Sequence, residues 1–172
     1  GLMQVHDYGV RKVLEDQQRQ RNFPAPLDWM KGIERFWDVR PGPGKVIFAS
    51  SQFQVDTLAL NHPNNSVSYR MTETKDDGSR CRFVYATDWE PLGPLLLDRR
   101  EKLSEDEKRS LEERVEQQRR DMIQFWEHAD VVISDSQYEP YGSEEFPGNK
   151  FMVTWGHSDF RTNINLATRA GV

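Results

Sequence analysis

The chain has 172 residues, with 23 lysines and arginines against 28 aspartates and glutamates, and a formal net charge of −5. This length allows one domain with its own core, and we expect residues 1–172 to form a single domain. Because the net charge is negative and no stripe of lysine and arginine runs along the sequence, nucleic acid is not expected as a partner.

The sequence also has no features of a membrane or disulfide-stabilised protein. No stretch reaches the roughly 18 apolar residues of a membrane span, and no apolar signal core is present near Gly1. A single cysteine, Cys81, cannot form an internal disulfide. We therefore expect a cytoplasmic protein in which Cys81 is a packed or strand-surface thiol.

The first part of the chain carries weak structural signals. Residues 1–20 indicate a strand or loop that leads into a short helix, with Val13 and Leu14 as its apolar anchors. The prolines in 22–26 end any helix there, because proline lacks an amide donor and restricts the residue before it. Another short helix is predicted over 27–33.

Residues 46–60 have the pattern of β-strands. The apolar run 46–48 follows a loop of prolines and glycines, and the β-prone residues Phe53, Val55 and Thr57 then occupy every second position. Over 58–60 the apolar residues are consecutive, which predicts that this part of the strand is buried on both faces.

Two hairpins are predicted next. The turn residues 63–65, followed by alternating apolar residues, indicate a hairpin over 58–71 with His62 at its tip. The polar run 75–79 contains a glycine and indicates a second hairpin, whose return strand covers 81–87. Three or four consecutive antiparallel strands result.

A long helix is predicted over about 105–127. Ser104 and Glu107 match a capping box, and apolar residues recur at helical spacing on one face, with Trp126 on that core face. The opposite face is charged and rich in glutamine, which indicates exposure to solvent. A short buried strand over 131–133 is predicted to follow.

The last part of the chain is predicted to contain one strand and one helix. The strand covers 151–153, after a loop that contains several prolines and glycines. Ser158 is expected as the N-cap of the final helix and Gly171 as its stop.

Three residues with metal-binding or acid–base chemistry stand at the ends of these elements. His62 and Asp88 lie at the tips of neighbouring strands, and His157 precedes the final helix. Imidazole and carboxylate groups are ligands of zinc and related ions. From the residues alone, His62 is better explained as a turn histidine before proline. Asp88 is also explained as a turn or capping carboxylate, and His157 as a loop histidine.

Aromatic residues flank these candidates. Trp89 follows Asp88, and Trp155 comes two residues before His157. Tyr138 lies in the loop after the strand over 131–133. We expect Trp89, Trp155 and Tyr138 to be candidates for the wall of a substrate pocket.

The order of these pieces resembles the second half of the metallo-β-lactamase superfamily, over residues of about 20–172. It looks most like the branch that includes tRNA 3′-processing endonucleases and cyclic-phosphate phosphodiesterases. The pieces that carry the resemblance are the strand ending at His62, the strand before Asp88, the long helix, the strand before Asp135, and the Gly-His-Ser run that contains His157. The resemblance implies an α/β (α+β) fold, the αββα sandwich, of which this chain supplies mainly the second sheet with its helices.

The resemblance also implies a role for each residue. His62 would be a ligand in a site for two divalent metal ions, zinc or manganese, and Asp88 would bridge them. Asp135 would support the site without binding the metal, and His157 would donate a proton to the leaving group. The implied activity is hydrolysis of a phosphodiester, with a small-molecule or nucleotide-like substrate such as a cyclic phosphate.

This sequence departs from the family pattern in two ways. The family's leading ligand motif, HxHxDH, is absent, and the last histidine ligand would be expected beyond Val172. We therefore expect the chain to be the interior of a longer domain, inactive alone and associated with the missing part or with another copy. Two alternatives stay open: a non-catalytic interaction or scaffold domain of the same fold that has lost the metal, and an unrelated small α/β domain.

Overall fold

The computed structural model describes residues 10–19, 26–32, 42, 44–63, 66–142, 144 and 152–172. Contacts divide the chain into two compact units, Gly1–Arg40 and Pro41–Val172. In the first unit, α1 (Val10–Gln17) is the predicted short helix. The helix predicted over 27–33 is a single 3-10 turn, η1 (Leu27–Trp29), and Ile33 and residues 22–25 lie outside the described residues.

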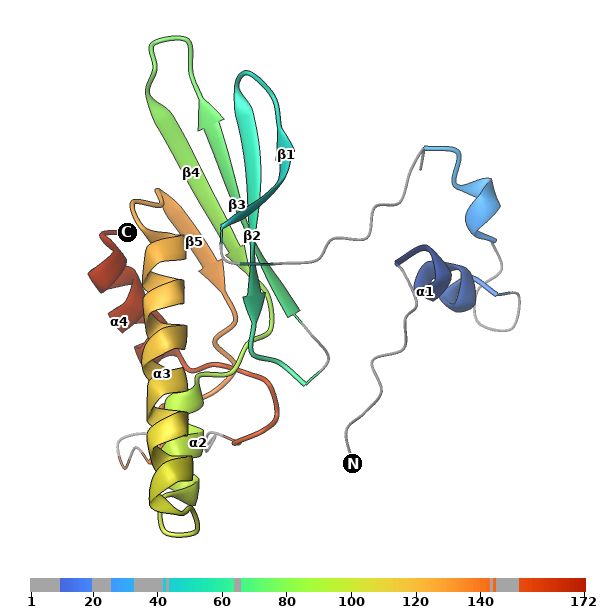
Figure 1. Cartoon of the computed structure of the whole chain (residues 1–172). Coiled ribbons are helices and arrows are strands. Elements are labelled where there is room, and N and C mark those ends of the chain that lie inside the picture. Colours follow the sequence, from blue (N-terminus) through green and yellow to red (C-terminus); the bar gives the residue numbers. More distant parts are fainter. Residues whose placement is uncertain are drawn as a thin grey trace. The chain divides into compact units, whose positions relative to one another are not determined.

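The second unit is built on a five-stranded sheet with the strand order β1-β2-β3-β4-β5 (Figure 1). Its first four strands pair antiparallel in chain order, which confirms both predicted hairpins. The last strand, β5, pairs parallel with β4. The strands are β1 (Lys45–Ala49), β2 (Phe53–Leu60), β3 (Ser66–Thr74), β4 (Arg80–Ala86) and β5 (Val131–Ser134).

Three helices lie on one side of this sheet (Figure 1). They are α2 (Leu92–Arg99), α3 (Glu105–Trp126) and α4 (Phe160–Ala170). The predicted capping box of α3 is present, because Ser104 Oγ accepts from the Glu107 amide at 3.4 Å and the Glu107 carboxylate accepts from the Ser104 amide at 2.8 Å. Since β4 and β5 are parallel, the chain must cross between them, and α2 and α3 form that crossover.

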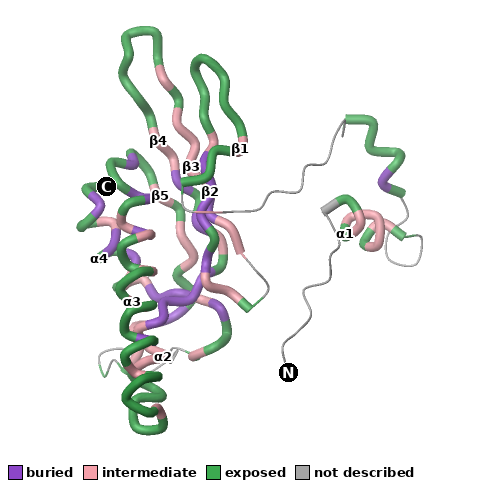
Figure 2. The backbone as a smooth tube through the Cα atoms, in the orientation of Figure 1, coloured by how far each residue is buried: buried purple, intermediate pink, exposed green. Residues whose placement is uncertain are grey.

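The core lies between the helices and the facing side of the sheet, and Figure 2 shows the exposed hairpin tips beyond it. Val84 and Ala86 of β4 face the helices and are almost fully buried. Trp126 of α3 is 1% exposed, which confirms its expected place in the core. The described core residues are Leu58, Leu60, Val84, Ala86, Trp89, Met122, Phe125, Trp126, Ala129, Leu166 and Ala170.

Two predictions of strand burial are wrong, burial on both faces over 58–60 and a buried strand over 131–133. Leu58 and Leu60 are buried, but Ala59 between them is exposed. In β5, Val131 and Ile133 are 49% and 51% exposed. The reason is that the helices cover one face of the sheet, so alternate residues of each strand point away from them.

Three local predictions also differ from the structure. Helix α2 was not predicted, because Gly93 and Pro94 are residues that disfavour the interior of a helix. Both lie in the first turn of α2, where proline is tolerated. The N-cap of α4 is Asp159, whose carboxylate accepts from the Thr162 amide at 2.8 Å, instead of Ser158. No strand covers 152–153, and Phe151 lies outside the described residues.

The end of α4, the exposure of Cys81 and the length and polarity of the helices bear on three further expectations. The Gly171 stop is confirmed, since this residue closes α4 in the left-handed conformation with φ 73°. Cys81 is exposed at the start of β4. Among the helices of the described residues, none is both long enough and apolar enough to cross a bilayer.

Candidate functional site

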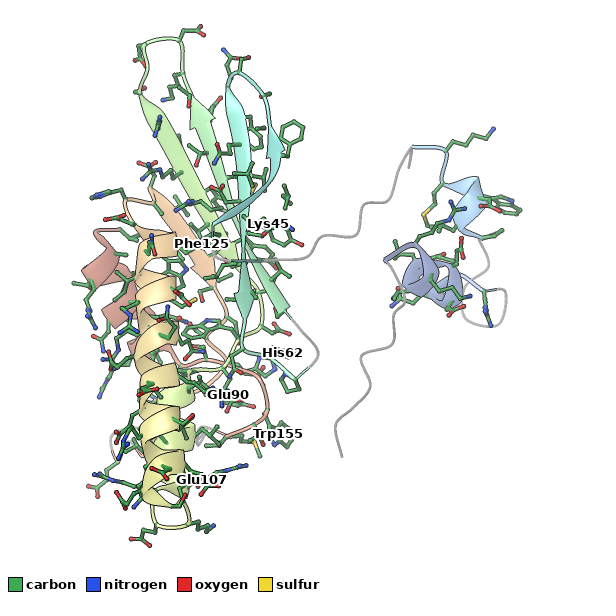
Figure 3. All side chains as sticks on the ribbon, viewed as in Figure 1. Lys45, His62, Glu90, Glu107, Phe125 and Trp155 are labelled. Atoms are coloured by element: carbon green, nitrogen blue, oxygen red, sulfur yellow. The ribbon has the colours of Figure 1, made fainter. Side chains whose placement is uncertain are left out.

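Strands β2, β4 and β5 end at the same edge of the sheet. β2 and β4 both run antiparallel to β3, and β5 runs parallel to β4, so the three share one direction. Ala86 pairs with Ser134 at the ends of β4 and β5. His62, Asp88 and Asp135 follow the three strand ends within two residues, and Figure 3 labels His62 at this edge.

Asp88, Asp135 and His157 converge at this edge. Each offers one potential ligand atom, and these atoms lie within 4.8 Å of one another. Asp88 is exposed, while Asp135 and His157 are half-buried. The structure therefore brings together three residues that are far apart in the sequence, and the parallel pairing of β4 with β5 accounts for the closeness of the two carboxylates.

Asp135 holds the His157 ring in one orientation. The His157 Nδ1 atom lies 3.0 Å from Asp135 Oδ2, and the same oxygen accepts from the Ser158 amide at 3.0 Å. A hydrogen bond from Nδ1 to a carboxylate fixes the tautomer in which Nδ1 carries the proton. The Nε2 atom is then the acceptor, available to a metal or to a proton in transit.

His62 approaches His157 from the end of β2. The two ring centroids are 6.2 Å apart, and the ring planes are inclined by 76°. Gly156, the residue before His157, lies against the His62 ring and has a φ of 86°. A Cβ atom on Gly156 would lie 2.7 Å from His62 Nε2 and 2.8 Å from Pro63 Cδ, so the backbone of Gly156 is in close contact with the His62 ring.

Tyr138 forms one wall of this group of side chains. It is 6% exposed, and its ring packs edge-on against the His157 ring at a centroid distance of 5.9 Å. The Tyr138 amide donates to the Ser158 carbonyl at 3.0 Å. Burial, followed by the charges of Asp135 and Glu90, raises the pKa of the Tyr138 hydroxyl, which keeps this wall neutral.

The two tryptophans predicted as pocket walls lie in different surroundings. Trp89 is 1% exposed, belongs to the core and donates from Nε1 to Ser134 Oγ at 3.0 Å. It also lines a groove of about 310 Å³ between β2 and α3. Trp155 is 60% exposed next to Gly156, in the turn labelled in Figure 3.

A buried carboxylate that the sequence did not single out, Glu90, lies under the site. It is 6% exposed, and its two oxygens accept from the amides of Thr154 at 2.5 Å and Gly156 at 3.2 Å. Its own backbone is hydrogen-bonded to Asn61. Backbone partners leave no trace in a sequence, so only the closeness of Glu90 to Asp88 along the chain could have indicated it.

The donor set fits a divalent metal ion of the zinc or manganese type. Ligands at about 2.0 to 2.2 Å from a shared zinc ion lie at most about 4.4 Å apart, so atoms within 4.8 Å need shifts of only a few tenths of an ångström. Imidazole and carboxylate are the ligand types that such ions take. Carboxylate support behind a histidine, as Asp135 gives His157, is a common feature of metal sites.

Comparisons with protein families, curated proteins and solved structures gave no match. No protein-family model matches the sequence, no curated protein matches it, and no solved structure matches the fold. Function must therefore be inferred from the site itself.

Proposed function

We propose that this chain carries part of the active site of a divalent-metal-dependent hydrolase of the metallo-β-lactamase type, acting on phosphodiester bonds. One observation carries the proposal: Asp88, Asp135 and His157 offer ligand atoms within 4.8 Å of one another at the edge where His62 also lies. His62, Asp88 and Asp135 follow strand ends and His157 precedes α4, so elements of the sheet and a helix hold this set of donors.

Within this proposal, His62 and Asp88 hold the metal, and Asp135 and His157 perform acid–base work beside it. His62 is not in the group of ligand atoms within 4.8 Å, so it would reach the metal from the end of β2. A bound zinc or manganese ion polarises a phosphoryl oxygen and lowers the pKa of water. His157 presents Nε2 toward the reacting group and donates a proton to the departing oxygen, while Asp135 keeps the opposite ring nitrogen protonated and stabilises the imidazolium form. Tyr138 orients the same ring by edge-on packing.

The αββα sandwich belongs to the proposal as well. The helices cover one face of the sheet, and the other face presents apolar side chains from adjacent strands. Tyr85, Val131 and Ile133 on β4 and β5 are between 45% and 51% exposed. An apolar face of this kind supports the packing of a second sheet against it.

The metal is tested first, by titrating zinc and manganese into the purified, metal-free chain under calorimetry. We expect His62→Ala and Asp88→Asn to weaken binding by at least about tenfold, because each removes a ligand. His128→Ala is the matched control, since this histidine lies at the end of α3 with a side chain that is 72% exposed. Equal affinity in all variants, or no binding to the wild type, would contradict the proposal.

A second candidate is a non-catalytic interaction or scaffold domain of the same fold. One observation favours it: the sequence holds only four histidines and no HxHxDH motif. The same titration separates the two candidates, because a scaffold that has lost its metal would not bind zinc at this edge.

A cytoplasmic location is part of either proposal, supported by the exposed thiol of Cys81, which suits a reducing compartment.

A further inference from the structure

The turn before His157 has an unusual backbone. Thr154 has φ 74° and Gly156 has φ 86°, both in the left-handed region. For a β-branched residue such as Thr154 this conformation is strained. Strain of this kind persists only where the surroundings impose it, and it is concentrated at functional sites.

Glu90 supplies the constraint. The amides of Thr154 and Gly156 both donate to its carboxylate, one to each oxygen. Two amides from a left-handed turn that converge on one anion form a backbone nest. A buried carboxylate costs free energy unless its oxygens are hydrogen-bonded, so the charge of Glu90 and the strained turn stabilise each other.

Glu90 is in turn anchored on the side of His62. Its amide donates to the Asn61 carbonyl at 2.8 Å, and the Asn61 side-chain amide donates to the Glu90 carbonyl at 2.9 Å. Gln118 of α3 donates to the same carbonyl at 2.8 Å. Glu90 therefore joins the residue before His62 to the turn before His157.

We infer that Glu90 is a positioning residue, which sets the spacing between the His62 and His157 rings through its hydrogen bonds to the Thr154–Gly156 turn. Its importance for catalysis rests on the proposed function, but the positioning itself is a property of the metal-free chain. Without the carboxylate, the strained turn relaxes, Gly156 leaves the His62 ring, and His157 leaves the oxygen of Asp135.

The inference is tested with Glu90→Gln, which keeps the size of the side chain but replaces one acceptor oxygen with a donor. In the metal-free protein, NMR spectra should show faster hydrogen exchange of the Thr154 and Gly156 amides and shifted ring signals of His157. Zinc affinity should fall by about ten- to a hundredfold, as for other residues that orient metal ligands. Glu113→Gln, on the exposed face of α3, is the matched control and should leave all three readouts unchanged.

Three outcomes are informative. A Glu90→Gln variant that melts at a lower temperature but keeps wild-type His157 ring signals has lost only a structural contact, and this overturns the inference. A wild type that binds no zinc contradicts the proposed function, while the ring signals of the metal-free variant still decide the positioning role. If Glu90→Gln does not fold, Glu90→Asp keeps the charge but shortens the reach, and unchanged ring signals in that variant overturn the inference.

Discussion

The His62 ring occupies the space that a side chain at Gly156 would need. A Cβ atom there would approach His62 Nε2 to 2.7 Å, and the backbone φ of 86° is one that side chains rarely adopt. Glycine is therefore required at this position for two separate reasons. One is the backbone conformation, and the other is the packing of a candidate metal ligand.

These two reasons can be separated by mutation. Gly78, in the β3–β4 turn, has a similar φ of 81°, but a Cβ there would meet nothing within 4 Å. Gly78→Ala should therefore cost only the conformational term, about 1 to 2 kcal/mol. Gly156→Ala should cost roughly 1 to 3 kcal/mol more, because it adds overpacking against His62. Urea unfolding measures both, and equal losses would show that the contact with His62 is unimportant for stability.

His157 and Asp135 should act as a pair in catalysis. In the complete protein, with bis(p-nitrophenyl) phosphate as substrate, His157→Ala should lower kcat by roughly 10² to 10⁴ if His157 donates the proton. Asp135→Asn should lower kcat in the same direction, since it removes the carboxylate that orients the ring. Bound metal, measured by mass spectrometry, should change little in either variant. Loss of metal in step with activity would make His157 a ligand instead.

The buried pair between Arg70 and Asp56 should be important for folding. Arg70 Nε lies 3.1 Å from Asp56 Oδ2, and the Asp56 side chain is 2% exposed. Asp56→Ala should cost about 3 kcal/mol in the free energy of unfolding, because it leaves the arginine without its partner in a largely buried place. Glu116→Ala, which removes a partner of exposed Arg119, should cost about 0.5 kcal/mol or less. A similar small loss for Asp56→Ala would contradict this expectation.

The capping box at Ser104 gives a prediction for the long helix. Ser104→Ala should cost about 1 kcal/mol, because the first turn of α3 loses a side-chain acceptor. Ser110→Ala, in the same helix, should be neutral or slightly stabilising, since alanine has the higher helix propensity. Thermal unfolding followed by circular dichroism tests both. A loss at Ser110 as large as that at Ser104 would argue against capping as the cause.

The same capping box should make part of the stability depend on pH. The hydrogen bonds that Glu107 accepts from Ser104 lower the pKa of its carboxyl group. A lowered pKa in the folded state means that this contribution is present above the ordinary glutamate pKa of about 4.3 and is lost as the pH falls through the folded value. The difference in melting temperature between wild type and Ser104→Ala should therefore narrow in acid. A constant difference down to pH 2 would contradict the role of the ionised Glu107.

Strong local signals made much of the second unit predictable from the sequence. The two hairpins follow from the turn residues 63–65 and 75–79, and α3 follows from the Ser104 capping box and helical spacing. The roles predicted for His62, Asp88, Asp135 and His157 stay predictions, although the structure places these residues at one edge of the sheet.

Features that depend on tertiary contacts could not be predicted in this way. The exposure of Val131 and Ile133 depends on which sheet face the helices cover, and a short apolar run carries no such information. Glu90 was missed because its carboxylate binds amides 64 and 66 residues further along the chain. Such contacts leave no residue pattern, and only the folded chain reveals them.

The exposed thiol of Cys81 gives the protein a built-in attachment point for a reporter dye. It is the chain's single cysteine and lies at the start of β4, whereas Asp88 follows the other end of that strand. Seven residues of extended chain place the two roughly 20 Å apart. A maleimide fluorophore would thus label every molecule at one site, at the opposite end of β4 from Asp88, without any cysteine having to be removed or introduced by mutagenesis.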